Sequence, residues 1–136
     1  MVKILIVEDH RSFRETLKEY LNGELSWVIL EEAANGREAM EKVGSFRPDL
    51  IFMDICLPEA SGLELTRKIT ANYPGTEVII MTGYESMGYQ ELAAQYGAKG
   101  FFSKGEVTGK DILAFIKPFQ PLKGNGGGED PRDRRR

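Results

Sequence analysis

The sequence contains one cysteine, one histidine and one tryptophan among its 136 residues. The single thiol, Cys56, excludes an internal disulfide and any zinc site built from several cysteines. No apolar run approaches the roughly 20 residues that a membrane-spanning helix requires. The apolar N-terminal segment ends in acid after seven residues, so it is too short for a signal peptide. We therefore expect a cytoplasmic protein that does not contact the membrane.

The length and composition predict one soluble domain followed by a short tail. Hydrophobic residues make up 41% of the chain and charged residues 29%, which is ordinary for a globular domain with a proper core. The net charge of −3 argues against direct nucleic-acid binding by this domain. Residues 124–136 are rich in glycine and arginine and have no apolar side chain to bury. We expect a folded domain over residues 1–123 and a disordered tail or linker over 124–136.

Five short apolar runs recur at intervals of roughly 20–28 residues, the rhythm of repeated strand–helix units. The middle three are continuous rather than alternating, as in strands that are covered on both faces. The runs are Val2–Val7, Trp27–Leu30, Leu50–Met53, Val78–Met81 and Phe101–Phe102. With right-handed crossovers, they predict a (βα)5 fold with a parallel five-stranded sheet and helices on both faces.

Helix starts are indicated by an N-cap residue with an acid three positions later. These pairs are Ser12 with Glu15, Asn35 with Glu38, Ser61 with Glu64, and Thr108 with Asp111. The first helix is predicted to stop at Asn22-Gly23. Another short helix is expected around Gln90–Tyr96, with a start weakened by Gly88.

Polar side chains stand where four of the predicted strands end. Glu8 and Asp9 follow the first strand, Asp54 ends the third, and Thr82 and Lys104 end the last two. An open α/β sheet binds its ligand beyond the carboxyl ends of its strands, so these groups should converge there. Three carboxylates, a hydroxyl and an ammonium together suit a divalent cation and a phosphoryl group.

Each of these residues has a distinct part in that chemistry. Magnesium prefers oxygen ligands, which Asp9, Asp54 and the backbone carbonyl of Cys56 can supply, while Glu8 holds a metal-bound water. Asp54 can also act as a nucleophile and form an aspartyl phosphate. The ammonium of Lys104 then neutralises one phosphoryl oxygen.

Each residue alone also has an ordinary structural interpretation. An acid at a strand end is commonly a loop or helix-cap residue, and Thr82 before a glycine is often a turn hydroxyl. Lys104 alone is usually a solvated charge, and Phe101 is by default a core aromatic. His10 suggests a phosphoacceptor, yet a single loop histidine is more often simply exposed. Only the joint pattern favours function.

Taken together, the motifs resemble those of response-regulator receiver domains of two-component signal transduction, over roughly residues 1–120. The matching segments are Val7-Glu8-Asp9, Met53 to Pro58, Gly62, Met81-Thr82-Gly83 and Gly100 to Lys104. The resemblance implies the flavodoxin-like doubly wound fold, with strand order 2-1-3-4-5.

The resemblance also implies a role for each site residue. Asp54 matches the phosphoacceptor and Lys104 the phosphate-binding lysine. Magnesium, with manganese as a substitute, would be held by Glu8, Asp9, Asp54 and the Cys56 carbonyl. Thr82 and Phe101 match the switch pair, and Gly83 and Tyr84 stand where access to the site is controlled. Phe101 lacks the hydroxyl of the usual tyrosine, so we expect switching to depend mainly on packing.

The implied partners follow from the same family. A sensor histidine kinase would be the phosphodonor, and the surface of helix 4, strand 5 and helix 5 would control a downstream protein or a DNA-binding output domain. Dimerisation on phosphorylation is possible. The sequence Gly97 to Gly105 resembles receivers that precede helix-turn-helix domains, and Gly105 replaces the usual proline, so no cis peptide is expected. A single-domain regulator and a piece of a longer protein both remain open.

Three alternatives share the fold or the chemistry. A phosphohydrolase with an aspartyl-phosphate intermediate would carry a second aspartate where Cys56 stands, and a thiol is a poor general acid. A receiver-like scaffold that is never phosphorylated would usually lack one of the site residues. A flavodoxin needs a first loop that binds phosphate, whereas the segment Glu8 to Arg11 would repel it. We therefore expect a signalling domain rather than an enzyme, beyond its own phosphorylation and dephosphorylation.

Overall fold

A computed structural model of the protein describes residues 1–83 and 87–122. Its main sheet contains five parallel strands in the order β2-β1-β3-β6-β7. The strands are β1 (Val2–Val7), β2 (Val28–Ala33), β3 (Leu50–Asp54), β6 (Glu77–Thr82) and β7 (Gly100–Ser103). Numbered among themselves, these strands have the order 2-1-3-4-5, so the predicted flavodoxin-like doubly wound fold is confirmed.

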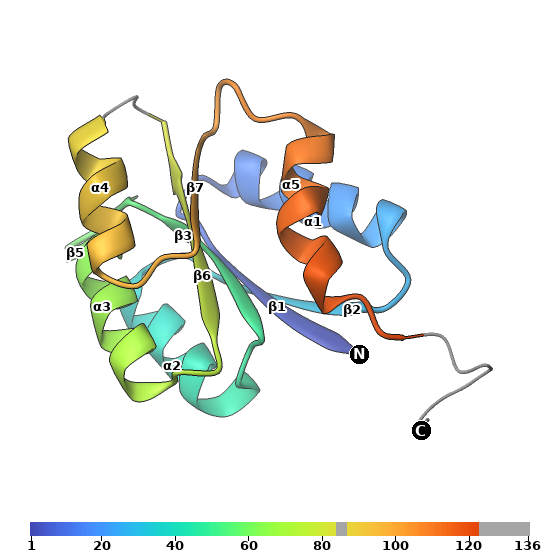
Figure 1. The fold of residues 1–136 in the computed structure, drawn as a ribbon, viewed down its shortest axis with the longest axis horizontal. Helices are drawn as coiled ribbons and strands as arrows, with labels where there is room; N and C mark the ends of the chain where they lie inside the picture. Colours follow the sequence, from blue (N-terminus) through green and yellow to red (C-terminus); the bar gives the residue numbers. More distant parts are fainter. Residues whose placement is uncertain (84–86, 123–136) are drawn as a thin grey trace.

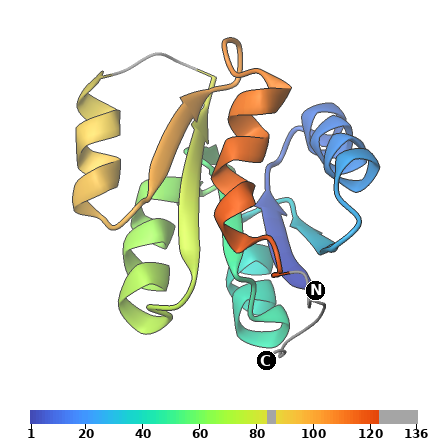
Figure 2. The same ribbon diagram turned by 45° about the vertical axis from the view of Figure 1, so that its right-hand side comes forward.

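In the part of the chain that the structure describes, five α-helices cover the two faces of this sheet. They are α1 (Arg11–Glu24), α2 (Gly36–Phe46), α3 (Gly62–Asn72), α4 (Met87–Gln95) and α5 (Gly109–Ile116), which continues into the 3-10 helix η1 (Lys117–Phe119). Helices α1 and α5 lie on one face, and α2, α3 and α4 lie on the other (Figures 1 and 2). Within the described ranges, none of the helices has the length and apolar character needed to cross a membrane.

The core consists of two apolar clusters that are separated by the sheet. One cluster joins Leu17 and Leu21 of α1 to Phe52 of β3. The other joins Ile69 of α3 to Ile51, also of β3. Neighbouring side chains of β3 therefore point to opposite faces, and both faces are buried. Because β3 is covered on both sides, its last residue is delivered to the edge of the sheet from a rigid strand.

The helix starts agree with the predicted caps at three of four places. The side chains of Asn35, Ser61 and Thr108 each accept a hydrogen bond from the backbone N–H three residues later, at 2.9, 3.4 and 3.1 Å. The prediction for Ser12 is wrong, because α1 begins at Arg11 and its N-cap is His10, which makes no side-chain capping bond. The N-cap position is therefore set by the loop after β1 and not by the local Ser-x-x-Glu pattern.

Helix and strand boundaries also differ from the sequence expectations at several places. Helix α1 continues through Gly23 to Glu24, and α4 begins at Met87, before the predicted range. Strand β2 runs on to Ala33 and is an edge strand, on which Ile29 is 42% exposed. The expectation that this strand is covered on both faces is therefore wrong. Nothing in a short apolar run distinguishes an edge strand from an inner one.

A small antiparallel hairpin directly after β3 was not predicted. It pairs β4 (Cys56–Leu57) with β5 (Ala60–Ser61), and Glu59 in its turn has a φ of 55°. The backbone N–H of Gly62 then donates to the carbonyl of Ile55 at 2.9 Å. A Cβ at Gly62 would lie 2.0 Å from the carbonyl oxygen of Asp54, so only glycine allows this close approach. The hairpin thereby fixes the chain that follows Asp54.

Candidate functional site

The parallel register brings the predicted carboxylates together at one edge of the sheet. Val7 of β1 pairs with Met53 of β3, so Glu8 and Asp54 follow on neighbouring strands at the same level. Both side chains are buried, Glu8 at 0% and Asp54 at 3% exposed. Asp9, one residue further into the loop, is half-buried. This crowding follows from strand order alone, as the sequence predicted.

Lys104 reaches the same carboxylates from the loop after β7. Its Nζ lies 2.5 Å from Oε1 of Glu8 and 3.4 Å from Oδ2 of Asp54. Its backbone N–H donates to the carbonyl of Thr82 at 2.8 Å, which ties this loop to the end of β6. The tighter pair with Glu8 was not predicted, since Lys104 was expected to bind a phosphoryl oxygen and Glu8 a water. Without cation or phosphate, Glu8 is therefore the main partner of the ammonium.

The two buried carboxylates titrate as a coupled pair. Burial, followed by the hydrogen bond and the charge of Glu8, raises the pKa of Asp54 to about 7. Burial alone would also raise the pKa of Glu8, but Lys104, the His10 N–H and the bond with Asp54 outweigh it, and the pKa of Glu8 is lowered. Near neutral pH the pair therefore holds on to a proton that belongs mainly to Asp54.

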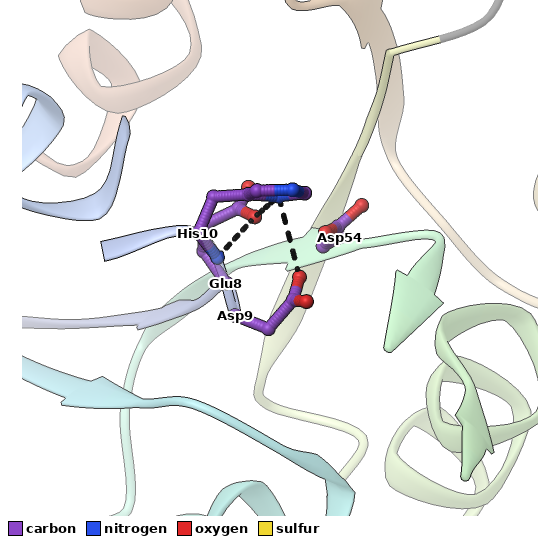
Figure 3. Close-up of side chains that lie close together, drawn as sticks. All are labelled: Glu8, Asp9, His10 and Asp54. Carbon is purple, nitrogen blue, oxygen red and sulfur yellow. Dashed lines mark hydrogen bonds and ion pairs between the residues drawn. The ribbon is translucent and has the colours of Figure 1, made fainter. Parts of the chain in front are cut away.

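The oxygen atoms of this site fit a divalent cation. Oε1 of Glu8 and Oδ1 of Asp9 are buried and have no hydrogen bond, although the first forms the ion pair with Lys104. Glu8, Asp9, His10 and Asp54 each offer a ligand atom, and these atoms all lie within 4.8 Å of one another (Figure 3). Buried carboxylate oxygens without hydrogen bonds are costly unless a cation neutralises them. The residues present therefore suit a hard divalent cation such as magnesium.

The backbone after Asp54 is oriented by that side chain. The N–H of Cys56 donates to Oδ1 of Asp54 at 3.3 Å, while the thiol of Cys56 is exposed. The sulfur is not one of the clustered ligand atoms among the described residues. This placement is consistent with the expectation that Cys56 would bind a cation through its backbone carbonyl and not through its thiol.

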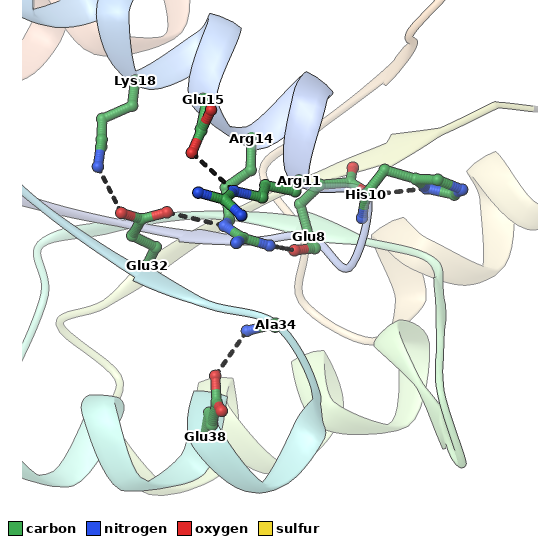
Figure 4. Close-up of polar contacts among 9 residues, drawn as sticks. All are labelled: Glu8, His10, Arg11, Arg14, Glu15, Lys18, Glu32, Ala34 and Glu38. Atoms are coloured by element: carbon green, nitrogen blue, oxygen red, sulfur yellow. Dashed lines mark hydrogen bonds and ion pairs between the residues drawn. The ribbon is translucent and has the colours of Figure 1, made fainter.

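Two residues of α1 contact the site although neither was predicted to belong to it. Nη1 of Arg14 donates to the carbonyl of Glu8 at 2.7 Å, and its Nε donates to Glu32 at 2.7 Å (Figure 4). The ring of Phe13 lies under the ammonium of Lys104, with 5.0 Å from Nζ to the ring centroid. In the sequence, Phe13 looked like an ordinary apolar helix residue and Arg14 like a surface charge. Only the packing of α1 against the loops reveals these contacts.

A cavity of about 440 Å³ lies next to Arg14, between the N-terminal ends of α1 and α2. Its charged lining is already paired within the protein, since Arg11 contacts Glu15 and Arg14 contacts Glu32. The carboxylate of Glu38 accepts the backbone N–H of Ala34 at 2.8 Å (Figure 4). Among the described residues that line it, the cavity thus offers no unpaired cation for an anionic ligand.

The remaining predicted site residues that the structure describes lie on β6 and β7 or directly after β6. Thr82 ends β6 and is buried, and Gly83 after it is exposed, with open space where a Cβ would stand. Phe101 of β7 is half-buried against the core formed with α2, α3 and α4. Tyr84 lies outside the described residues. The peptide before Gly105 is trans, as expected, since the described residues contain no cis peptide.

The family model of the response regulator receiver domain matches residues 4–117. Among curated proteins, the transcriptional regulatory protein YdfI of Bacillus subtilis is 38% identical over 104 residues, covering 76% of this chain and 48% of that protein. The transcriptional regulatory protein DegU of Brevibacillus brevis is 32% identical over 116 residues, covering 85% of this chain and 49% of its own length. The chain thus spans about half the length of these relatives.

Solved structures show the same fold. A CheY-like response regulator receiver domain protein from Methanospirillum hungatei JF-1 superposes with a TM-score of 0.80 at 31% identity, covering 88% of this chain and 93% of that one. The signal receiver domain of NarL from Mycobacterium tuberculosis superposes with a TM-score of 0.79 at 24% identity, covering 87% and 94%. The second likeness supports the architecture alone.

Proposed function

The chain belongs to the response-regulator receiver family, and we propose that it is a magnesium-dependent phosphoacceptor module in which Asp54 receives the phosphoryl group. A sensor histidine kinase is the proposed donor. The observation that carries this proposal is the burial of Asp54 beside Glu8, with Lys104 Nζ 3.4 Å from its Oδ2. A buried carboxylate next to a second acid destabilises the folded protein. Such arrangements, with a neighbouring ammonium, are typical of functional sites.

The proposed transfer is a substitution at phosphorus. An oxygen of Asp54 attacks the phosphorus atom, the bond from phosphorus to the donor nitrogen breaks, and the donor imidazole leaves with that electron pair. Lys104 then moves from Glu8 towards an oxygen of the bound phosphoryl group and neutralises its charge. Asp9, Asp54 and the carbonyl of Cys56 are the proposed magnesium ligands, with Glu8 acting through a water. Magnesium would supply charge neutralisation at the phosphoryl oxygens.

The proposed output passes through the far strands of the sheet. Thr82 would bind a phosphoryl oxygen, and Phe101 on the neighbouring strand would change its packing in response. The surface of α4, β7 and α5 would then bind a downstream protein or an output domain, or a second copy of this domain. The proposed domain covers residues 1–123; the tail, 124–136, lies outside the described residues.

A phosphohydrolase remains the less favoured function. Such an enzyme needs a general acid close to the nucleophile, and the position two residues after Asp54 is held by Cys56. Its side chain is exposed, and a thiol is a weak general acid at neutral pH. We therefore propose a signalling role, with catalysis limited to the domain's own phosphorylation and dephosphorylation.

The test is the intact mass of the protein after incubation with acetyl phosphate and magnesium. The wild-type protein should gain one phosphoryl group, and Asp54→Asn should gain none. Chelation of magnesium with EDTA should abolish the gain in the wild type. Labelling of Asp54→Asn to the same extent as the wild type would contradict the assignment. Magnesium binding without labelling, and without beryllofluoride binding, would favour a scaffold that is never phosphorylated.

A further inference from the structure

His10, the only histidine of the chain, is directed at the acid pair although it stands at the start of a helix. Its Nδ1 lies 3.1 Å from Oε2 of Glu8 and 3.5 Å from Oδ1 of Asp9 (Figure 3). The rest of the side chain is open to solvent, since it is 73% exposed. As the N-cap of α1 it makes no side-chain capping bond, so its imidazole has no structural duty in starting the helix.

We propose that His10 is a nitrogen ligand, which makes this cation site a site for transition-metal cations such as Zn²⁺ in addition to Mg²⁺. The inference rests on the cation site of the proposed function and goes beyond it by naming a further ligand and a class of cation. Carboxylate oxygens alone suit magnesium, whereas an imidazole adds affinity for zinc, cobalt and manganese. A neutral imidazole contributes little to the binding of magnesium, so the effect is selective.

The backbone geometry holds the imidazole in place for this role. The N–H of His10 donates to Oε2 of Glu8 at 3.1 Å, and its carbonyl accepts the N–H of Arg14 at 3.0 Å. Arg14 in turn donates to the carbonyl of Glu8. The Cα of His10 is therefore fixed from both sides, and only its side-chain torsions need to adjust when a cation binds.

The carboxylate of Asp9 is available to the same cation. Oδ1 of Asp9 is buried without a hydrogen bond and lies 3.5 Å from the imidazole nitrogen. Oε1 of Glu8, on a side chain that is fully buried, is already engaged by Lys104, so Glu8 acts through a water as in the proposed function. An oxygen of Asp9, an oxygen of Asp54 and Nδ1 of His10, in the tautomer that leaves Nδ1 without a proton, form a donor set that suits zinc.

The competing candidate for a zinc ligand is the thiol of Cys56, because zinc binds thiolates strongly. Its side chain is exposed, and its sulfur is outside the cluster of ligand atoms that Glu8, Asp9, His10 and Asp54 form among the described residues. The geometry therefore favours the imidazole over the thiol, and separate variants of the two residues distinguish them.

The experiment measures Zn²⁺ and Mg²⁺ affinity by calorimetry on protein from which any histidine tag has been removed. The variants are His10→Gln, Cys56→Ser and, as a matched exposed neighbour, Arg11→Gln. We expect His10→Gln to weaken Zn²⁺ binding roughly tenfold or more and to change Mg²⁺ binding less than about twofold. Arg11→Gln should change the ratio of the two affinities little, because Arg11 contacts Glu15 and not the cluster.

A second readout observes the imidazole directly. Because the chain has one histidine, its ring nitrogen signals in an NMR spectrum are unambiguous. Stoichiometric Zn²⁺ should shift one ring nitrogen strongly, and Mg²⁺ should not. Zinc binding with unshifted ring nitrogens, or a loss of zinc affinity in Cys56→Ser that His10→Gln lacks, would overturn the role of His10. If Mg²⁺ binds and the wild type is labelled by acetyl phosphate in those cases, only the role of His10 fails; if neither cation binds, both proposals fail.

Discussion

Two aspartates stand at the two ends of strand β3, and their carboxylates have opposite environments. Asp49 precedes the strand at its amino end, and its carboxylate accepts the backbone N–H of Lys3 at 2.9 Å. Its own N–H and carbonyl join the ladders to β1 and β6, at 2.8 and 3.0 Å. Asp54 ends the strand, is almost fully buried, and faces Glu8 with a pKa raised to about 7.

The difference shows that the carboxylate at one end of β3 stabilises the fold, whereas the carboxylate at the other end does not. At the amino end the carboxylate of Asp49 satisfies a backbone donor and so stabilises the register of β1 against β3. At the carboxyl end the carboxylates of Glu8 and Asp54 compete for one proton and one ammonium. The fold gains no stability from that competition, which supports the proposed role of this end of the strand in binding a cation and a phosphoryl group.

The largest expected effect is on phosphorylation of the protein when each of these two aspartates is replaced by the isosteric amide. The two variants should differ completely in labelling. Asp54→Asn removes the proposed nucleophile and should abolish the mass gain with acetyl phosphate, whereas Asp49→Asn should keep it at the wild-type level. Loss of labelling in both variants, with both folded by circular dichroism, would show that the contrast between the two ends of β3 is false.

Lys104 provides the second largest effect, because it is the cation that balances the carboxyl end. Lys104→Met leaves Glu8 buried without its ion-pair partner, and the free energy of unfolding should fall by about 3 kcal/mol. Added magnesium should recover part of this loss by replacing the missing positive charge. Urea unfolding with and without magnesium measures both quantities, and an unchanged midpoint would mean that the pair contributes nothing.

The raised pKa of Asp54 predicts a pH dependence of the cation-free protein. Between 3.8, its ordinary value, and about 7, the folded state binds a proton that the unfolded state has released. The free energy of unfolding should therefore fall as pH rises through this window, and Asp54→Asn should flatten the slope. The lowered pKa of Glu8 acts the other way and only below its ordinary 4.5. A wild-type slope that survives in Asp54→Asn would place its origin elsewhere.

Replacement of Asp49 should have a smaller effect on stability, and this effect should not respond to magnesium. Asp49→Ala removes the acceptor of the Lys3 N–H, so the protein should lose about 1 to 2 kcal/mol of stability. Magnesium should not restore it, because Asp49 is remote from the cation site. Restoration by magnesium would contradict the assignment of a purely structural role.

The contact between Phe13 and Lys104 should give the smallest effect. Phe13→Leu keeps an apolar side chain on α1 but loses the attraction between the ring and the ammonium. A double-mutant cycle with Lys104→Met should give a coupling energy of about 0.5 to 1 kcal/mol. Strict additivity of the two substitutions would show that the ring contributes only packing.

The arrangement of the site could be predicted from the sequence where it depends on topology. Glu8, Asp54, Thr82 and Lys104 stand at strand ends, and a parallel sheet of this order brings such ends together whatever the side-chain details. The Asn35 cap was likewise readable, because it depends on residues only three apart. These predictions depend on the period and order of elements, which the sequence carries.

The features of the site that were not predicted depend on contacts between segments that are distant in the sequence. The ion pair of Lys104 with Glu8 and the bond from Arg14 to the Glu8 carbonyl need the exact placement of α1 and the last loop. The hairpin after Asp54 has strands of two residues, too short for any apolar period. Ser12 failed as a cap because the loop after β1 makes His10 the N-cap instead.

The most direct test compares the stability of the wild type and Asp54→Asn in urea at slightly alkaline pH, with and without magnesium. The account predicts that the variant is the more stable of the two without magnesium, because it removes a carboxylate that Glu8 repels. Magnesium should stabilise the wild type more than the variant and so reduce or reverse the difference. A wild type that is already more stable than Asp54→Asn without magnesium would contradict the claim that this end of the sheet is held ready for a cation.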